Sequence, residues 1–430
     1  MPRTVRGFIL QPSYRIEQRV PVIHLWGRLE TGEPFLVRDD RCVPHFYLRQ
    51  ADRVRAEELG VARVVDSRRV TLGGEPVVRI EVPPPPDTVP VRERLHRAGV
   101  ATFEADVRFA VRYLIDRDIR GAISIRGEAR DMGQGLSVFE NPTLAPVDWT
   151  PSLSVLSLDI ETDPQARRIL SIGLWGCGAA EVLLLTPAGE TCPPPGIPFE
   201  GEREMLQALA ARIRELDPDV ITGWNVLDFD FTVLVRRAEE LGAELALGRS
   251  AETIRLLPGR ARRESTRVSI SGRLVLDGLQ LLRGAFVRME RHSLDFVARQ
   301  VLGEGKILTG GQKAEQILHA FQNDRRQFVD YNLTDARLVL EILESLRLID
   351  LAVARSRLTG LPLDRISSSV AAFDFLYLKE LGKRGIVAPS VRARQGLAET
   401  LLGGGHVLEP LPGLYENVWV LDFKSLYPSI

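Results

Sequence analysis

The middle of the sequence alternates short apolar runs with longer amphipathic segments, and this alternation restricts the fold more than any other feature. The runs Val155 to Ile160, Ile169 to Trp175 and Val220 to Trp224 are short and apolar, as strands are. The segment from Phe231 to Leu241 has apolar residues at helical spacing and is followed by Gly242, a typical helix stop. Strands that alternate with helices predict an α/β domain.

The chain is too long for a single ordinary core, because one hydrophobic core rarely serves more than about 250–300 residues and this sequence has 430. Before the α/β region, apolar runs such as Val20 to Gly27 are followed by turn residues, which predicts strands and hairpins. Asparagine and proline residues punctuate the stretch from Asn141 to Pro151. We therefore expect a β-rich N-terminal domain over residues 1–150, an α/β domain over 151–345 and a third unit over 346–430.

Composition and charge narrow the class of protein. The formal net charge is −1, so any nucleic-acid contact has to come from local basic patches. No apolar run approaches the roughly 20 residues that cross a bilayer, and the first residues lack the apolar core of a signal peptide. Cys42, Cys177 and Cys192 are far apart, which argues against a disulfide framework or a zinc site. We expect a cytoplasmic protein with no membrane contact.

Two acids lie close together on the first predicted strand of the α/β domain. Asp159 and Glu161 are two residues apart, so on a strand they project from the same face. Adjacent carboxylates on an apolar strand are costly unless cations neutralise them, and hard divalent cations prefer carboxylate oxygens. The pair alone is also compatible with two solvated acids at the edge of a sheet.

Two further acids follow along the chain. Asp230 lies between an apolar strand and the next helix, where open α/β sheets gather their ligands, although a helix N-cap aspartate has the same position. Asp335 follows Tyr331 by four residues, which puts the phenol and the carboxylate on one helical face. Taken alone, this last pair is also typical of a helix surface.

The four acids together are more specific than any one of them. They fall in one predicted domain, in chain order, on a strand, a strand-to-helix junction and a helix. Phosphodiester hydrolysis at neutral pH needs an activated water and charge neutralisation at the attacking and leaving oxygens, and two metal ions about 3.5–4 Å apart supply both. The sequence therefore predicts a two-metal site for phosphodiester hydrolysis.

Three segments carry a resemblance to a known family. Asp159–Thr162, Asn225–Asp230 and Tyr331–Asp335 have the patterns D-x-E-T, N-x-x-x-F-D and Y-x-x-x-D. In this order and spacing they resemble the exonuclease motifs of family B DNA polymerases. Leu421–Ile430 is similar to the first polymerase motif of that family, and Gly404–Glu409 resembles its bacterial branch, DNA polymerase II.

The resemblance implies a multidomain α/β fold. A β-rich N-terminal domain would be followed by a ribonuclease H-like 3′-to-5′ exonuclease domain. Residues 346–430 would hold a return segment of the N-terminal domain and the start of a polymerase palm, cut after its first motif. There the apolar run Val418–Leu421 is expected to be a strand whose partners come from the rest of the palm. We expect no primer extension from this part of a polymerase alone.

The resemblance also implies roles for the acids. Asp159 would bridge two divalent metal ions, Mg²⁺ with Mn²⁺ as a substitute. Glu161 and Asp335 would complete the first metal site, and Asp230 would hold the second ion. Tyr331 would orient the attacking water. The implied activity is proofreading, in which the 3′-terminal nucleotide of single-stranded or mispaired DNA is hydrolysed.

Other residues match family positions that contact DNA or nucleotide. Asn225 and Phe229 would position the terminal nucleotides by hydrogen bonding and stacking, with a helix cap and a core aromatic as the competing interpretations. Asp422 resembles a ligand of the polymerase metals, and Tyr427 the residue under the incoming sugar. The six arginines from Arg255 to Arg273 that precede the third motif are compatible with phosphate contact and with a solvated loop: Arg255, Arg260, Arg262, Arg263, Arg267 and Arg273. The remaining implied contacts are Ser425 and Leu426 for the nucleotide and Lys306, Arg260, Arg262, Arg263, Gly404 and Gly405 for DNA.

The implied partner is DNA, as a single-stranded 3′ end or a primer-template. A dNTP would bind only to a full-length chain, and a sliding clamp would dock on a segment beyond Ile430. Two other functions compete. A stand-alone DNA or RNA exonuclease can have the same carboxylates, but it has no use for the polymerase-like segment Leu421–Ile430. A non-catalytic DNA-binding scaffold is disfavoured by the intact set of acids.

Overall fold

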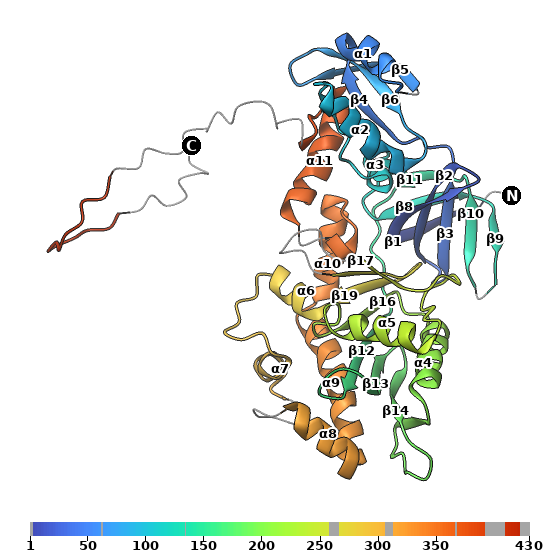
Figure 1. The fold of residues 1–430 in the computed structure, drawn as a ribbon, viewed down its shortest axis with the longest axis vertical. Helices are drawn as coiled ribbons and strands as arrows, with labels where there is room; N and C mark the ends of the chain where they lie inside the picture. The colour runs from blue at the N-terminus through green and yellow to red at the C-terminus, as the bar shows by residue number, and fades with distance from the viewer. Residues whose placement is uncertain are drawn as a thin grey trace. The chain divides into compact units, whose positions relative to one another are not determined.

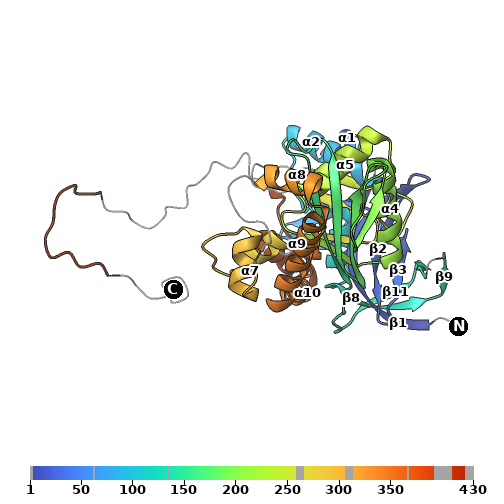
Figure 2. The same ribbon diagram turned by 90° about the horizontal axis from the view of Figure 1, so that it is seen from below.

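The computed structural model describes residues 3–61, 63–133, 135–257, 266–305, 313–365, 368–391 and 409–421. The chain divides into two compact units, Met1–Ser390 and Val391–Ile430. The helices and strands named below all belong to the first unit, which Figures 1 and 2 show in two views. Among the described residues, no helix combines the length and the apolar character that a membrane crossing requires.

A seven-stranded sheet forms the N-terminal part of the first unit. Its longest strands pair antiparallel, and Leu29 N donates to Glu33 O at 2.8 Å in the turn that follows. The strand and hairpin predicted around Val20 to Gly27 are confirmed. The order is β11-β8-β1-β2-β3-β10-β9. The bounds are β1 (Arg3–Glu17), β2 (Val20–Leu29), β3 (Pro34–Asp39), β8 (Ala122–Gly127), β9 (Ala129–Asp131), β10 (Ser137–Glu140) and β11 (Thr143–Pro146), with α3 (Phe109–Asp116) packed on the sheet.

A second, five-stranded sheet has the order β20-β5-β6-β4-β7. Leu48 from the sheet and Leu95 from a helix are both fully buried in its core. Its edge strand β20 comes from far along the chain and pairs parallel with β5. The bounds are β4 (His45–Arg49), β5 (Arg63–Thr71), β6 (Pro76–Glu81), β7 (Thr102–Phe103), β20 (Ile386–Val387), α1 (Arg53–Glu58) and α2 (Thr88–Arg97), with 3₁₀ turns at Gln50–Asp52 and Pro85–Asp87.

The predicted α/β region forms a six-stranded mixed sheet with the order β15-β14-β13-β12-β16-β19. Strand β12 pairs antiparallel with β13 and parallel with β16, which in turn pairs parallel with β19. The predicted strands are present, and the α/β class is confirmed. The bounds are β12 (Val155–Thr162), β13 (Ile169–Gly176), β14 (Ala179–Leu185), β15 (Gly196–Phe199), β16 (Val220–Gly223) and β19 (Leu274–Asp277), with the helices α4 (Glu202–Leu216), α5 (Asp230–Leu241) and α9 (Arg325–Ser345).

Alternation along β12 gives the two faces of this sheet different characters. Leu158 and Ile160 are buried in one hydrophobic cluster with residues of α4 and α5. Because side chains alternate along a strand, Asp159 and Glu161 project from the opposite face, and α9 packs along β12 and β13 there. Figures 1 and 2 show α4 and α9 on opposite sides of the sheet. The acids therefore lie between the sheet and α9.

After α9 the chain returns to the N-terminal part of the unit. Leu361 and Phe375 join the core of the seven-stranded sheet. Gly360, with φ of +84°, leaves room for the Phe375 ring, which a Cβ would approach to 2.1 Å. The division into domains at residues 150 and 345 stays a prediction. The remaining elements are β17 (Arg255–Leu257), β18 (Arg267–Ser269), α6 (Gly278–Gly284), α7 (Leu294–Leu302), α8 (Lys313–Asn323), α10 (Leu348–Thr359), a 3₁₀ turn (Leu363–Arg365) and α11 (Ser369–Lys383).

In the second unit, the structure describes residue 391 and residues 409–421. Residues 409–421 contain no strand, and the strand expected over Val418–Leu421, which was to pair with the rest of a palm, stays a prediction. Trp419 and Val420 are 86% and 89% exposed. An apolar run becomes a strand when a neighbouring strand satisfies its backbone groups, and residues 409–421 form no such pair.

Candidate active site

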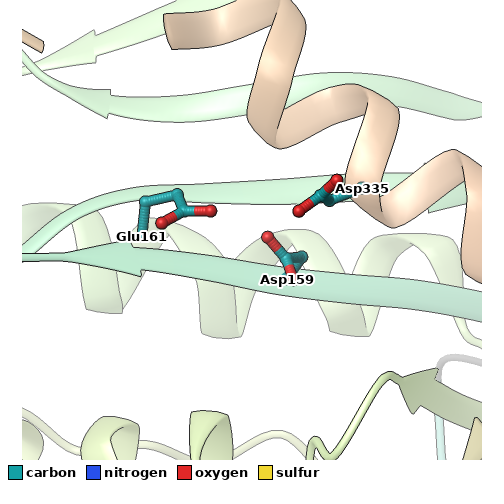
Figure 3. A group of neighbouring side chains, drawn as sticks. All are labelled: Asp159, Glu161 and Asp335. Carbon is teal, nitrogen blue, oxygen red and sulfur yellow. The ribbon is translucent and has the colours of Figure 1, made fainter. Parts of the chain in front are cut away.

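Three carboxylates meet between the six-stranded sheet and α9. Asp159 and Glu161 come from β12 and Asp335 from α9, and one oxygen of each lies within 4.8 Å of the other two. In Figure 3 the two strand acids and the helix acid point toward one shared space. Glu161 and Asp335 are buried, and Asp159 is partly exposed. The structure thus brings together three of the four acids that the sequence singled out.

Hydrogen bonds fix the backbone of both elements that carry these acids, the strand β12 and the helix α9. In the β12–β13 ladder Asp159 pairs with Gly173, and Glu161 pairs with Ser171. Helix α9 is capped by Asp324, the residue before it, whose carboxylate accepts the N–H of Gln327 at 3.0 Å. Such a cap satisfies a backbone donor that the first turn of a helix leaves open. The strand and the helix therefore present their acids from regular, hydrogen-bonded backbone.

Asp230 lies next to this group but is not one of its members. It is the first residue of α5, and its Oδ1 accepts the N–H of Ile160 at 3.0 Å. Burial and, next, the negative charge of Asp159 raise the pKa of Asp230 well above its ordinary value. The cap position of α5 belongs to Phe229. The N-cap interpretation of Asp230 is therefore wrong, and the residue ties α5 to β12 beside Asp159.

Tyr331 is buried among the same acids. Burial first, and then the charges of Glu161, Asp335 and Asp159, raise the pKa of its hydroxyl far above the ordinary value. The hydroxyl also forms a hydrogen bond with Asp335. The phenol therefore stays protonated and acts as a donor within the group of acids.

Asn332, which the sequence analysis did not select, also contacts an acid of the site. Its Nδ2 donates to Asp159 Oδ2 at 2.8 Å. The residue follows Tyr331 directly, and its position in the sequence gives no reason to place it over β12. The sequence carries no signal for this contact, because the full burial of Asn332 in α9 is known only from the structure.

The loop between β16 and α5 carries two of the predicted DNA contacts. Phe229 is 40% exposed, so the competing interpretation as a core aromatic is wrong. Asn225 is exposed with φ of +63°, and no side chain caps α5, so the cap interpretation is also wrong. The other predicted residues lie outside the described part of the chain: Arg260, Arg262, Arg263, Lys306, Gly404, Gly405, Asp422, Ser425, Leu426 and Tyr427.

The donor set of the three carboxylates fits a hard divalent cation. Mg²⁺ takes oxygen ligands at about 2.0–2.1 Å, so two ligands on opposite sides of the ion are about 4.2 Å apart. The oxygens of Asp159, Glu161 and Asp335 lie within 4.8 Å of one another. Small side-chain rotations are enough to let them share one ion.

Two family models match the chain. The model described as "DNA polymerase family B, exonuclease domain" matches residues 100–297. The model described as "DNA polymerase family B" matches residues 367–430. Together these stretches make up more than half of the chain.

Whole-chain comparisons lead to the same family. The chain is 37% identical to DNA polymerase II of Escherichia coli (strain K12) over 345 residues, which are 79% of this chain and 43% of that protein. It is 28% identical to DNA polymerase 2 of Aeropyrum pernix over 465 aligned positions, covering 98% of this chain and 54% of that protein. The chain spans about half the length of these curated relatives.

A solved structure supports the likeness in three dimensions. The structure of the family B DNA polymerase from the hyperthermophilic archaeon Pyrobaculum calidifontis matches with a TM-score of 0.73 and 25% sequence identity, over 90% of this chain and 51% of that one. Sequence motifs, family models and fold agree, and the chain belongs to the family B DNA polymerases.

Proposed function

We propose that this chain carries a 3′-to-5′ proofreading exonuclease, which hydrolyses the 3′-terminal nucleotide of single-stranded or mispaired DNA. Two divalent metal ions serve it, Mg²⁺ with Mn²⁺ as a substitute. The observation that carries the proposal is the convergence of Asp159, Glu161 and Asp335. It occurs in a chain whose residues 100–297 match the exonuclease domain of the family.

Asp159, Glu161 and Asp335 would hold one metal ion, and Asp159 and Asp230 the other. Two such ions, when bound, supply activation of the attacking water and neutralise charge on the leaving 3′-oxygen. The raised pKa of Asp230 supports this assignment. After burial, the main cause of the raised pKa is the negative charge of Asp159 nearby. A cation between two such carboxylates offsets their repulsion.

The other side chains of the site bind and orient the reactants. The buried, protonated hydroxyl of Tyr331 donates a hydrogen bond among the acids, from where it would orient the attacking water. Phe229 offers an exposed ring for stacking of a terminal base. Asn225, exposed in the same loop, would bind the same nucleotides. Lys306, Arg260, Arg262, Arg263, Gly404 and Gly405 remain proposed DNA contacts.

The polymerase-related segment has a proposed role only in a longer chain. Asp422 would hold the polymerase metals, and Ser425, Leu426 and Tyr427 would contact a dNTP. We propose further that the longer chain binds a primer-template and a sliding clamp. We also propose that the protein is cytoplasmic. The domain division at residues 150 and 345 is part of the proposal as well.

The experiment is a double substitution, Asp159→Ala with Glu161→Ala, assayed on 5′-labelled single-stranded DNA with Mg²⁺. Wild type should shorten the labelled strand from its 3′ end one nucleotide at a time, and the double variant should leave the strand intact. A matched control is Glu239→Ala with Glu244→Ala, two exposed acids near the end of α5, which should digest like wild type. Digestion by a folded Asp159, Glu161 double variant at the wild-type rate would overturn the proposal.

A further inference from the structure

Asn332 is fully buried, at 0% exposure, and both ends of its amide are engaged. Its Nδ2 donates to Asp159 Oδ2 at 2.8 Å and lies 3.3 Å from the backbone oxygen of the same residue. Its Oδ1 accepts the hydroxyl proton of Ser171 at 2.8 Å. The amide therefore connects a strand acid of the site, a hydroxyl of β13 and the helix α9.

The amide of Asn332 has one orientation that satisfies all its partners. An ionised carboxylate accepts hydrogen bonds and donates none, so the NH₂ end has to face Asp159. The carbonyl end then faces Ser171, whose hydroxyl can rotate to donate. The opposite orientation would place an amide oxygen against the carboxylate, which leaves two acceptors facing each other. Ser171 thus keeps the donor of Asn332 directed at Asp159.

Strand β13 makes room for this amide. Gly173 pairs with Asp159 in the ladder, so the two residues lie side by side on the sheet. A Cβ at position 173 would lie 3.0 Å from the backbone oxygen of Asn332 and 3.1 Å from its Nδ2, which is tighter than ordinary contact. The absence of a side chain at this strand position lets the asparagine approach Asp159.

Asp159 is the acid whose orientation matters most for the site. It belongs to the group with Glu161 and Asp335, and Asp230 accepts the backbone N–H of Ile160, the residue after Asp159, at 3.0 Å. It therefore neighbours both proposed metal positions. A group that fixes its carboxylate fixes the geometry shared by both.

We propose that Asn332, held by Ser171, is a positioning residue for the exonuclease. It keeps the Asp159 carboxylate turned toward Glu161 and Asp335, so that the acids are arranged before a divalent cation binds. This inference rests on the proposed exonuclease function. Groups that orient a metal ligand from behind typically change metal affinity or activity by about 10- to 100-fold when they are removed.

The test is Asn332→Leu, which keeps a side chain of similar size and removes both hydrogen bonds. Mn²⁺ binding to the metal-free 430-residue chain is measured by calorimetry, without DNA, and the digestion of single-stranded DNA is measured separately. We expect Mn²⁺ binding to weaken and turnover to fall, each by about 10- to 100-fold, with little change in KM for DNA. Ser171→Ala should show a smaller loss in the same direction.

A matched control separates positioning from packing. Thr222→Val removes a buried hydrogen bond in the same sheet, from Thr222 Oγ1 to Leu276 O at 2.6 Å, and keeps the shape of the side chain. It should lower the unfolding midpoint and leave Mn²⁺ affinity unchanged. The double variant Asn332→Leu with Ser171→Ala should be no worse than Asn332→Leu, because both changes act through one contact.

The outcomes distinguish the two proposals. If wild type neither binds Mn²⁺ nor digests DNA, the proposed function fails. If wild type does both and Asn332→Leu binds Mn²⁺ as tightly as wild type, the positioning inference alone is overturned. If Asn332→Leu does not fold, Ser171→Ala decides: weaker Mn²⁺ binding at unchanged KM supports the inference, and wild-type affinity overturns it.

Discussion

Two clusters of acids in the first unit are held in opposite ways. The arginine cluster consists of Asp217 and Asp219 with Arg28, Arg249 and Arg273. Asp219 Oδ1 accepts from Arg28 at 2.8 Å and from Arg249 at 2.9 Å, and Asp217 Oδ1 accepts from Arg249 and Arg273 at 2.8 Å each. The carboxylate cluster consists of Asp159, Glu161 and Asp335, whose oxygens lie within 4.8 Å of one another.

The pKa of Asp217, in the arginine cluster, and the pKa of Asp230, beside the carboxylate cluster, shift in opposite directions. Burial alone would raise the pKa of Asp217, but the hydrogen bond and charge of Arg249, with the charges of Arg273 and Arg28, lower it below the ordinary value. Asp230, beside the carboxylate cluster, has its pKa raised by burial and by Asp159. The first cluster contains its own cations and ties β2 to the start of β16. The second gathers like charges, an arrangement that suits a cation from solution.

The largest expected effect is on activity at the carboxylate cluster. Asp335→Asn removes one ligand charge, and losing several kcal/mol of charge stabilisation corresponds to about 10³-fold in turnover. The same substitution should raise the unfolding midpoint of the metal-free protein, because it relieves repulsion between carboxylates. Nuclease assays and thermal unfolding with a chelator measure the two effects. If the variant lost both activity and metal-free stability, the claim that the acids of the carboxylate cluster repel one another, unlike those of the arginine cluster, would be contradicted.

At the arginine cluster the expected effect is on stability. Asp219→Asn leaves the three arginines of the cluster with the charge of Asp217 alone, and breaking a buried ion pair from one side costs about 3–5 kcal/mol of unfolding free energy. Turnover of the folded variant should stay at the wild-type level. The control is Glu215→Gln, whose exposed pair with Arg212 should contribute less than about 1 kcal/mol. Urea unfolding measures the free energy of unfolding of both variants. Equal decreases would show that the buried ion pairs of the cluster stabilise the fold no more than the exposed pair does.

The smallest expected effect is in the pH dependence of stability. The folded pKa of Asp217 is below its ordinary value, so its ionised form stabilises the fold at pH above about 4, the pKa of an unfolded aspartate. That stability is lost as the pH falls through the folded pKa. Asp217→Asn should therefore lose less stability than wild type when the pH is lowered from about 5 to about 3. Identical pH profiles would contradict this role for the arginine cluster.

The sequence predicts what local spacing determines. Asp159 and Glu161 share a face because they are two residues apart on β12, and Tyr331 and Asp335 share a helical face because they are four apart. The strands and α5 follow from apolar periodicity in the same way. Spacing within one element says nothing of distances between elements. The approach of α9 to β12 was therefore expected only from the order of the three motifs along the chain.

Two side-chain contacts that the sequence did not predict join residues far apart along the chain. Asn332 reaches Asp159 across 173 positions of the chain, and Arg28 reaches Asp219 across 191. Neither contact leaves a pattern within a window of the sequence. The strand expected over Val418–Leu421 is not formed within residues 409–421, because apolar character favours a strand but a neighbouring strand is needed to form it.

The most direct test is a calorimetric titration of Mn²⁺ into the metal-free chain. Wild type should bind saturably, and Asp159→Ala should lose this binding. Asp217→Asn, from the arginine cluster, should bind as wild type does, because Asp217 pairs with arginines and is not one of the three acids of the carboxylate cluster. Absence of binding to wild type, or equal binding by Asp159→Ala, would contradict the assignment of the carboxylate cluster as a metal site.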